Sequence, residues 1–245
     1  MYNEVFYVCK YIKEYDTSTQ ACEDSNVITI FQRCQGNNYD HSTKYCYDGT
    51  VKNKEIFTDE RDGKTYKYVI IGDQVWMAEN LKYEAPNTRC YGDDQNNCEI
   101  FGKMYDWETA IIVCPSGWRL PNDNDFSVLK NFVEAASKCR NCAGIVLKAN
   151  SALWNSNKGA DEFGFTALPG GYYRENHPGD DNNGFNQKNM TAGFWSTTEG
   201  YIKGSAHFRY FTSYFTGYNS SLNNMLNIEG FYINESFANV RCIKD

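Results

Sequence analysis

Four cysteines near the start of the chain have the spacing of a disulfide framework. Cys9, Cys22, Cys34 and Cys46 lie thirteen, twelve and twelve residues apart, and the phrases that end at Cys22 and Cys46 are similar. Units this short bury too little apolar surface to be stable without a covalent link. We predict the pairs Cys9–Cys22 and Cys34–Cys46, although four cysteines allow three pairings. A zinc site is the alternative, but these cysteines lack the close pairs that wrap the metal.

Two further cysteine pairs enclose short segments. Cys139 and Cys142 form a C-x-x-C motif that follows a helical pattern. A redox-active motif would need the start of a helix, where the thiolate pKa is lowered, so we expect a structural disulfide here. Cys90 and Cys98 enclose a polar loop, and we expect a local bridge between them as well.

Acid–base chemistry finds little support in the sequence. None of the histidines His41, His177 and His207 lies in an H-E-x-x-H motif or beside a Gly-x-Ser-x-Gly elbow. Ser205 and His207 lie two positions apart, and we do not interpret them as a triad by themselves. A glycosidase would need two carboxylates that meet in space, for which the candidates are Asp161, Glu162, Glu175 and Glu199. We therefore expect no catalytic residues, and a glycosidase-like enzyme is the least favoured hypothesis.

Tyrosines in the second half of the chain point instead to binding. They stand among Asn, Ser and Gly, and rigid rings between adaptable polar groups are typical of recognition surfaces. Sugar rings stack on such aromatic faces, and amides bind their hydroxyl groups. The expected ligand-binding residues are Tyr172, Tyr173, Arg174, Asn176, Trp195, Tyr201, Tyr210, Tyr214 and Tyr218. The alternative is that half or more of the tyrosines fill the core, where Trp195 also fits.

Charge and composition limit the partners and the compartment. A net charge of -7 without a basic cluster lacks the surface that nucleic acid needs. The acidic loop over residues 179–184 offers oxygen ligands to a hard cation, but we interpret it as a solvated loop and expect no metal or other cofactor. No apolar run reaches the roughly 18 residues of a membrane span. An even cysteine count favours an oxidising compartment. Residues 1–20 contain no apolar signal segment, so we expect export through a signal outside this sequence.

The elements that would position these side chains are short. Residues 64–71 and 74–77 predict two strands joined by a turn at Gly72 and Asp73. One helix is expected after a cap at Asp106, and the next after Pro121 with Asn122 or Asp123 as its cap. The first helix would place Trp107, Ala110, Ile111 and Cys114 on one face, and the second would place Phe126, Leu129, Val133 and Ala136 on one face. Beyond residue 145 we expect strands between polar loops and no further helix, which is an α+β plan whose core includes Trp76, Trp107 and Trp118.

Six phrases stand in one order along the chain, at Asp62–Tyr66, Ile71–Leu81, Cys114–Pro121, Phe163–Gly170, Phe194–Thr198 and Val240–Cys242. Together they resemble the Fibrobacter succinogenes major paralogous domain. The resemblance covers residues 60–245. The cysteine repeats before it resemble the small repeats that accompany this domain in large surface proteins.

That family is similar to the C-type-lectin-like fold, which the formylglycine-generating enzymes and some phage receptor-binding proteins share. The resemblance implies a C-type-lectin-like domain with two helices and a twisted antiparallel sheet, and it implies a disulfide between Cys114 and Cys242. Calcium-dependent sugar lectins carry Glu-Pro-Asn or Gln-Pro-Asp and then Trp-Asn-Asp, and this sequence has none of them. The formylglycine-generating enzymes are oxidases that use two reactive cysteines near the C-terminal part of the domain. In this sequence only Cys242 follows Cys142, so we do not expect that oxidase activity.

These observations predict two short disulfide-clipped repeats over residues 1–50, a linker over 51–61 and a C-type-lectin-like domain over 62–245. The expected function is a noncatalytic binding module that is secreted or displayed on a bacterial surface. The setting that the family implies favours plant cell-wall polysaccharide or another glycan as the ligand. The alternative is a structural or assembly module that binds protein partners in a surface complex.

Overall fold

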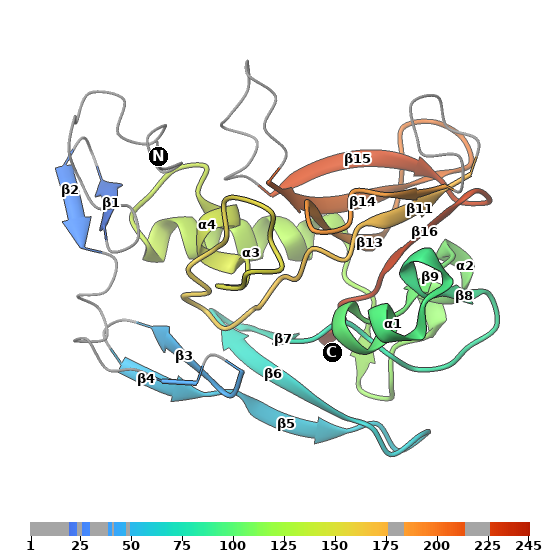
Figure 1. The fold of residues 1–245 in the computed structure, drawn as a ribbon, viewed down its shortest axis with the longest axis horizontal. Coiled ribbons are helices and arrows are strands. Elements are labelled where there is room, and N and C mark those ends of the chain that lie inside the picture. Colours follow the sequence, from blue (N-terminus) through green and yellow to red (C-terminus); the bar gives the residue numbers. More distant parts are fainter. Residues whose placement is uncertain are drawn as a thin grey trace.

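The computed structural model describes residues 20–23, 26–29, 39–40, 42–47, 50–175, 184–213 and 226–245, with the backbone alone for the first two ranges. These residues form two main sheets, two small hairpins and several helices (Figure 1). The predicted α+β class is therefore confirmed. No helix within the described ranges is long and apolar enough to cross a membrane.

The smaller main sheet has five strands, and every neighbouring pair is antiparallel. Its order is β10 (Trp118–Arg119), β17 (Ile243–Lys244), β7 (Gln74–Met77), β6 (Thr65–Ile71) and β5 (Glu55–Thr58). The predicted hairpin is confirmed by β6 and β7. Gly72 has a φ of +63° in the turn, and a Cβ there would press on the ring of Phe132, so glycine is required twice over.

The larger sheet has eight strands. Six follow the order β12 (Phe185–Asn186), β11 (Tyr172–Arg174), β16 (Ser236–Asn239), β13 (Thr191–Glu199), β14 (Ser205–Thr212) and β15 (Asn227–Tyr232). Two short strands extend it, because β9 (Met104–Tyr105) pairs with β16 and β8 (Thr88–Arg89) pairs with β9. The separate hairpins are β1 (Gln20–Glu23) with β2 (Asn26–Thr29), and β3 (Lys44–Tyr47) with β4 (Thr50–Asn53).

Two helices begin where their capping residues predict. Asp106 accepts a hydrogen bond from Thr109 N at the start of α2 (Trp107–Ile112), and Asn122 forms a capping box with Asp125 at the start of α3 (Asp123–Ala136). The sequence did not predict α1 (Gln95–Phe101), α4 (Ala143–Leu147) or the 3₁₀ turn η3 (Tyr91–Asp93), because these elements are too short to show an apolar period. Among the described residues no helix begins beyond residue 145, although α4 extends to Leu147.

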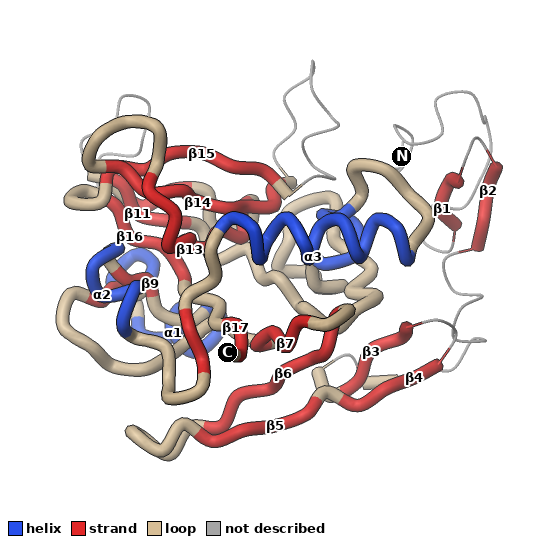
Figure 2. The backbone as a smooth tube through the Cα atoms, turned by 180° about the vertical axis from the view of Figure 1, so that it is seen from behind, coloured by secondary structure: helices blue, strands red, loops and turns tan. Residues whose placement is uncertain are grey.

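The main core lies on both sides of α3, which runs between the two sheets (Figure 2). It joins Val69 and Ile71 of β6, Phe126 and Leu129 of α3, and Phe194 of β13. The exposed residues of this helix are Asn124, Val128, Asn131 and Ala135.

A second core cluster lies beside α2 and contains Trp118 and Trp195. The predicted apolar face of α2 is only partly correct. Ala110 is buried, but Ile111 is exposed and Trp107 is half-buried, with its indole Nε1 donating to the carbonyl oxygen of Ser196 at 2.8 Å. Helix α2 has only six residues, and Ala110 is its one buried residue.

The segment predicted as a linker, residues 51–61, is structured instead. It contains most of β4 and all of β5, and β5 is an edge strand of the five-stranded sheet. The hairpin before it is also docked, because Tyr45 is buried in the main core and the Tyr47 ring lies 5.2 Å from that of Phe163. The β3–β4 hairpin therefore packs against the domain and is not separated from it by a flexible linker.

Three of the predicted disulfides are confirmed, namely Cys90–Cys98, Cys114–Cys242 and Cys139–Cys142. Cys46 is disulfide-bonded. The predicted partners Cys9 and Cys34 lie outside the described residues, as does the side chain of Cys22.

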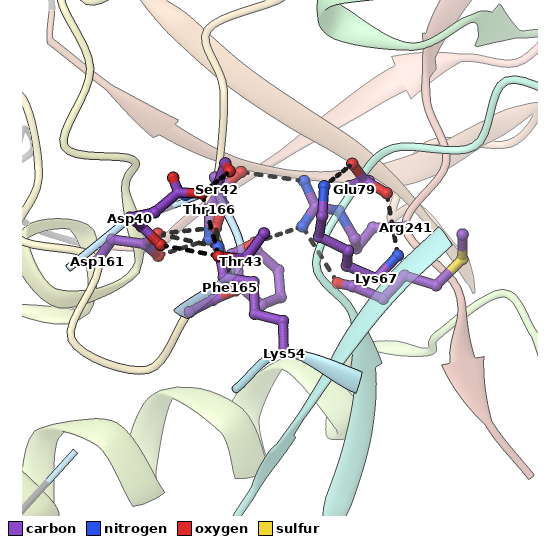
Figure 3. Close-up of polar contacts among 12 residues, drawn as sticks. Asp40, Ser42, Thr43, Lys54, Lys67, Glu79, Asp161, Phe165, Thr166 and Arg241 are labelled. Atoms are coloured by element: carbon purple, nitrogen blue, oxygen red, sulfur yellow. Dashed lines mark hydrogen bonds and ion pairs between the residues drawn. The ribbon is translucent and has the colours of Figure 1, made fainter. Parts of the chain in front are cut away.

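A guanidinium group is buried where the C-terminal segment meets both sheets. Arg241 is 1% exposed and lies beside Phe165 (Figure 3). Its Nε and Nη2 donate to Asn80 Oδ1 at 2.9 and 2.6 Å. Its Nη1 donates to the carbonyl oxygens of Met77 and Phe165 at 3.1 and 2.5 Å. Burial lowers the pKa of Arg241 to about 9. The surrounding oxygen atoms replace the water that would otherwise solvate this charge.

We predict that the two disulfides Cys114–Cys242 and Cys139–Cys142 differ in their contribution to stability. Their sequence separations are 128 and 3 residues. In the chain-entropy model, removing the first link with the double variant C114A/C242A costs about 5 kcal/mol and removing the second with C139A/C142A costs about 2 kcal/mol. Urea unfolding of both variants measures the difference, and equal losses would contradict the model.

We also expect Arg241→Met to lower the free energy of unfolding by about 3 to 5 kcal/mol, because Asn80 Oδ1 and the carbonyl oxygens of Met77, Phe165 and Thr166 lose their donor in a dry site. Arg119→Met is the matched control. Arg119 pairs with Asp125 at 2.7 Å, but 42% of its side chain is exposed, so we expect a loss of about 1 kcal/mol or less. Similar urea midpoints for the two variants would show that Arg241 is no more important than a surface arginine.

Candidate functional site

Three of the predicted ligand-binding residues belong to the core. Tyr172, Tyr173 and Trp195 are 6%, 8% and 0% exposed. Tyr172 and Tyr173 are neighbours on β11 and point to opposite faces of the sheet, and each face is covered, by Phe231 and Phe237 respectively. These three aromatic rings therefore lie in the core, which is the alternative that the sequence left open, and not on an exposed surface.

Two further predicted residues are only half-buried. Arg174 lies over the rings of Tyr172 and Phe231 and pairs with Glu229 at 3.4 Å. Tyr210 stacks on Phe208, and burial raises its pKa. Asn176, Tyr214, Tyr218 and most of the acidic loop 179–184 lie outside the described residues.

Among the predicted ligand-binding residues that the structure describes, Tyr201 is the one with a fully exposed side chain. It lies in the connection between β13 and β14 and is 95% exposed. The connection is held by hydrogen bonds from Gly200 N to Ser205 O at 2.7 Å and from Ser205 N to Ile202 O at 3.0 Å. The Tyr201 ring lies 5.1 Å from the ring of His207, centroid to centroid, and is tilted by 55°.

A network of polar side chains lies directly beneath this ring. Asp123 Oδ2 lies 2.5 Å from His207 Nδ1, and Asp123 Oδ1 accepts a hydrogen bond from Arg209 Nε at 3.2 Å. Arg209 Nη2 also donates to the carbonyl oxygen of Asp123 and to Ser127 Oγ, at 3.1 and 3.3 Å. The start of α3 is thus fixed to the middle of β14.

The position of Asp123 follows from its place at the first residue of a 14-residue helix. The free backbone N–H groups at a helix start favour a negative charge there. Its own N–H donates to Thr198 Oγ1 of β13 at 3.0 Å, so the carboxylate is aimed at β14. Asp123 therefore orients His207 as a carboxylate orients a histidine in many functional sites.

The second ring nitrogen of His207 has no hydrogen-bond partner among the described residues, although it is buried. Nδ1 faces the Asp123 carboxylate, so Nε2 is the ring nitrogen that is left for a ligand. A buried polar atom without a partner costs free energy. A hydroxyl group of a ligand, which can both donate and accept, would satisfy it.

The strand next to His207 carries a glycine, Gly230, with open space at its Cβ position. In the β14–β15 register His207 lies opposite Gly230, while Ser205 lies opposite Tyr232 and Arg209 opposite Ile228. A Cβ on Gly230 would contact only Ser205, with Oγ at 3.5 Å. We call this surface the His207 shelf and define it as Asp123, Tyr201, His207, Arg209, Gly230 and Tyr232.

Other candidate clusters are occupied by structural contacts. Asp161 binds the backbone and hydroxyl of Thr166, and Glu162 accepts from Ser137 Oγ at 2.9 Å. Glu175 and Glu199 are exposed, and Glu175 directly follows β11 whereas Glu199 is the last residue of β13. Within the described part of the chain, no three His, Cys, Asp or Glu side chains are placed to hold a metal ion.

In the sequence, His207 was weighed only together with Ser205, and that pair alone does not indicate a functional site. Residues two apart on a strand share a face, and β14 alternates polar Ser205, His207 and Arg209 with apolar residues. That alternation was the available signal for a polar face. The partner Asp123 lies 84 positions away in the sequence, so the pair itself could not be predicted.

Comparison with known proteins gives one match. The family model described as Fibrobacter succinogenes major domain matches residues 69–244. Searches of curated proteins and of solved structures found no match.

Two glycine variants test the geometry of the shelf. We expect Gly230→Thr to leave the free energy of unfolding within about 1 kcal/mol of wild type, because the position is open and threonine favours strands. Gly193→Ala, on β13, is the contrast, because a Cβ there would overlap the ring of Phe208. We expect that variant to lose about 3 kcal/mol or to misfold. Thermal unfolding of both distinguishes an open shelf from a closed one, and a strongly destabilised Gly230→Thr would show that the shelf is covered.

Proposed function

The chain belongs to the Fibrobacter succinogenes major domain family, and from this premise we propose that it is a noncatalytic bacterial surface module that binds a saccharide on the His207 shelf. The observation that carries the proposal is an exposed Tyr201 ring beside a buried, unpartnered His207 Nε2. A sugar stacks its C–H face on such a ring while a hydroxyl donates to the nitrogen.

The charged groups of the shelf suit a neutral polyhydroxylated ligand. Asp123 and Arg209 neutralise each other at 3.2 Å. Asp123 still exposes part of its side chain, with 22% accessible, and can accept from a second hydroxyl. Tyr232, which is 50% exposed, offers a second ring on the neighbouring strand. The ligand class is therefore a glycan, and plant cell-wall polysaccharide is the proposed source.

We further propose that the domain has a C-type-lectin-like fold. The support is the disulfide from the end of α2 at Cys114 to Cys242 beside the last strand, together with the mixed sheet and the long loops. Such a fold places its ligand surface on loops and strand ends above a rigid core, which is where Tyr201 lies.

Placement outside the cytoplasm is proposed on the disulfides. Three bridges between described cysteines, one of them closing 128 residues, persist in an oxidising compartment. The proposal of a noncatalytic role rests on the shelf itself. Ser205 Oγ donates to the Ile202 carbonyl oxygen at 2.7 Å and is not hydrogen-bonded to His207, so the pair is not arranged as nucleophile and base.

A protein ligand is the second candidate. Ten large apolar side chains are exposed among the described residues, and four of them lie on the His207 shelf or next to its residues in the sequence or across the strands, namely Tyr201, Ile202, Ile228 and Tyr232. Clustered apolar side chains of this kind are typical of protein interaction sites. The same surface would then serve an assembly module.

The binding test is a pull-down of the oxidised protein on insoluble cellulose, xylan, mannan and pectin. We expect retention on at least one polymer, a loss of about tenfold in affinity for Tyr201→Ala, and a comparable loss for Gly230→Thr, which adds a side chain to the exposed surface of the shelf beside Ser205. Ile56→Ala is the control, because Ile56 is 64% exposed but lies on β5 in the other sheet.

Retention that survives both shelf variants would place the glycan site elsewhere on the molecule. No retention of the wild type on any polymer would overturn the glycan proposal. The protein-binding candidate would then be tested with the same two variants.

A further inference from the structure

A lysine and an aspartate face each other in the interior where the β3–β4 hairpin meets the domain (Figure 3). Lys54 lies between β4 and β5, and its Nζ lies 3.6 Å from Oδ2 of Asp161. Both side chains are only 2% exposed. The separation exceeds the roughly 2.7 to 2.9 Å of a direct N–H···O⁻ hydrogen bond between charges, so this is not a tight salt bridge.

A hydroxyl group bridges the two side chains. Lys54 Nζ donates to Thr166 Oγ1 at 2.6 Å, and Thr166 Oγ1 donates to Asp161 Oδ2 at 2.7 Å. The backbone N–H of Thr166 also donates to Asp161 Oδ1 at 2.7 Å. The hydroxyl thus provides a path for a proton from the amine to one carboxyl oxygen.

Two residues of this arrangement have unfavourable backbone conformations. Asp161 and Thr166 have φ values of +51° and +54°, a region that a β-branched residue such as threonine rarely adopts. The surrounding contacts must therefore fix both residues. A fixed geometry between a nucleophile and its target is what an unassisted reaction between side chains requires.

The amine is also prepared chemically. Burial is the largest cause that lowers the pKa of Lys54, and it outweighs the opposing effect of Asp161. Arg241 and Lys67 add like charge. A lysine in such a site loses its proton more readily and becomes a nucleophile.

We propose that Lys54 and Asp161 form an intramolecular isopeptide bond. Nζ of Lys54 forms a bond to Cγ of Asp161, and the bond from Cγ to Oδ2 breaks. The ammonium group gives up two protons in total, one of them through Thr166 Oγ1, and both end on Oδ2, which leaves as water. An ammonium and a carboxylate are thus converted to a neutral amide and one water molecule, and no oxidant or cofactor is needed.

Burial selects this pair, because other lysine–carboxylate pairs are closer. Lys130–Glu134, Lys103–Glu84 and Lys64–Asp62 have N···O distances of 2.8, 2.8 and 2.9 Å. In each of these pairs at least one side chain is a fifth or more exposed, so water stabilises its charge. The link would tie the strand segment at β4 and β5 to the loop before Thr166, and it is independent of what the His207 shelf binds.

Mass spectrometry of the wild-type protein tests the proposal directly. After reduction and alkylation of the cysteines, we expect an intact mass lower than that of the sequence by one water molecule. Trypsin should give residues 53–61 joined to residues 159–174, because an acylated Lys54 is not cleaved. Lys130–Glu134 is the internal control and should give unlinked peptides. A full intact mass, with separate peptides ending at Lys54, would overturn the proposal.

Two variants test the chemistry. Lys54→Met should restore the full mass, and Thr166→Val should lower the rate at which the linked form appears after synthesis by about 100-fold, because the proton path is lost. A linked form in Lys54→Met would show that another lysine reacts. An unchanged rate in Thr166→Val would overturn the role of Thr166, and the wild-type mass remains decisive if either variant fails to fold.

Discussion

The buried charge of Arg241 is the constraint on which the rest of the structure depends. A guanidinium has five N–H donors in one plane, and in the interior each needs an oxygen. Asn80 supplies one from the segment after β7, and the carbonyl oxygens of Met77 and Phe165 supply others. The same group lies over the rings of Phe165 and Phe194. Segments that are far apart in the sequence must therefore meet around one cation. The neighbouring Cys242 then joins this point to α2 through Cys114.

This constraint also explains why charged groups gather at the junction with the β3–β4 hairpin. The loop that offers the Phe165 and Thr166 carbonyl oxygens to Arg241 turns back through Asp161 and binds Lys54. Gly164 in that loop allows Tyr45 to approach, since a Cβ there would collide with the Tyr45 ring. One loop thus serves the C-terminal segment on one side and the hairpin on the other. The hairpin is part of the same folding unit as the domain core.

Local signals in the sequence predicted the local structure, and they failed where distant segments meet. The caps Asp106 and Asn122 and the turn at Gly72 act within a few residues, so the two helices and the β6–β7 hairpin were predictable. The resemblance to a family supplied the Cys114–Cys242 bond. The burial of Tyr172 and Tyr173 was not predictable, because it depends on strands that cover both faces of β11. A tyrosine among polar residues looks the same in sequence whether a strand covers it or not.

The His207 shelf is a consequence of where α3 begins. Along one face of β14, Phe211 lies in the main core, Arg209 is held by Asp123 and Ser127, and His207 is the last residue that α3 reaches. Beyond that point Tyr201 and Tyr232 stand exposed. A capping box at Asn122 fixes the first residue of α3, so it also fixes the boundary between core and shelf. The proposed binding surface is therefore built on the edge of the rigid core. Asp123 already orients the histidine in the absence of a ligand, so the proposed binding would cost little conformational entropy at that position.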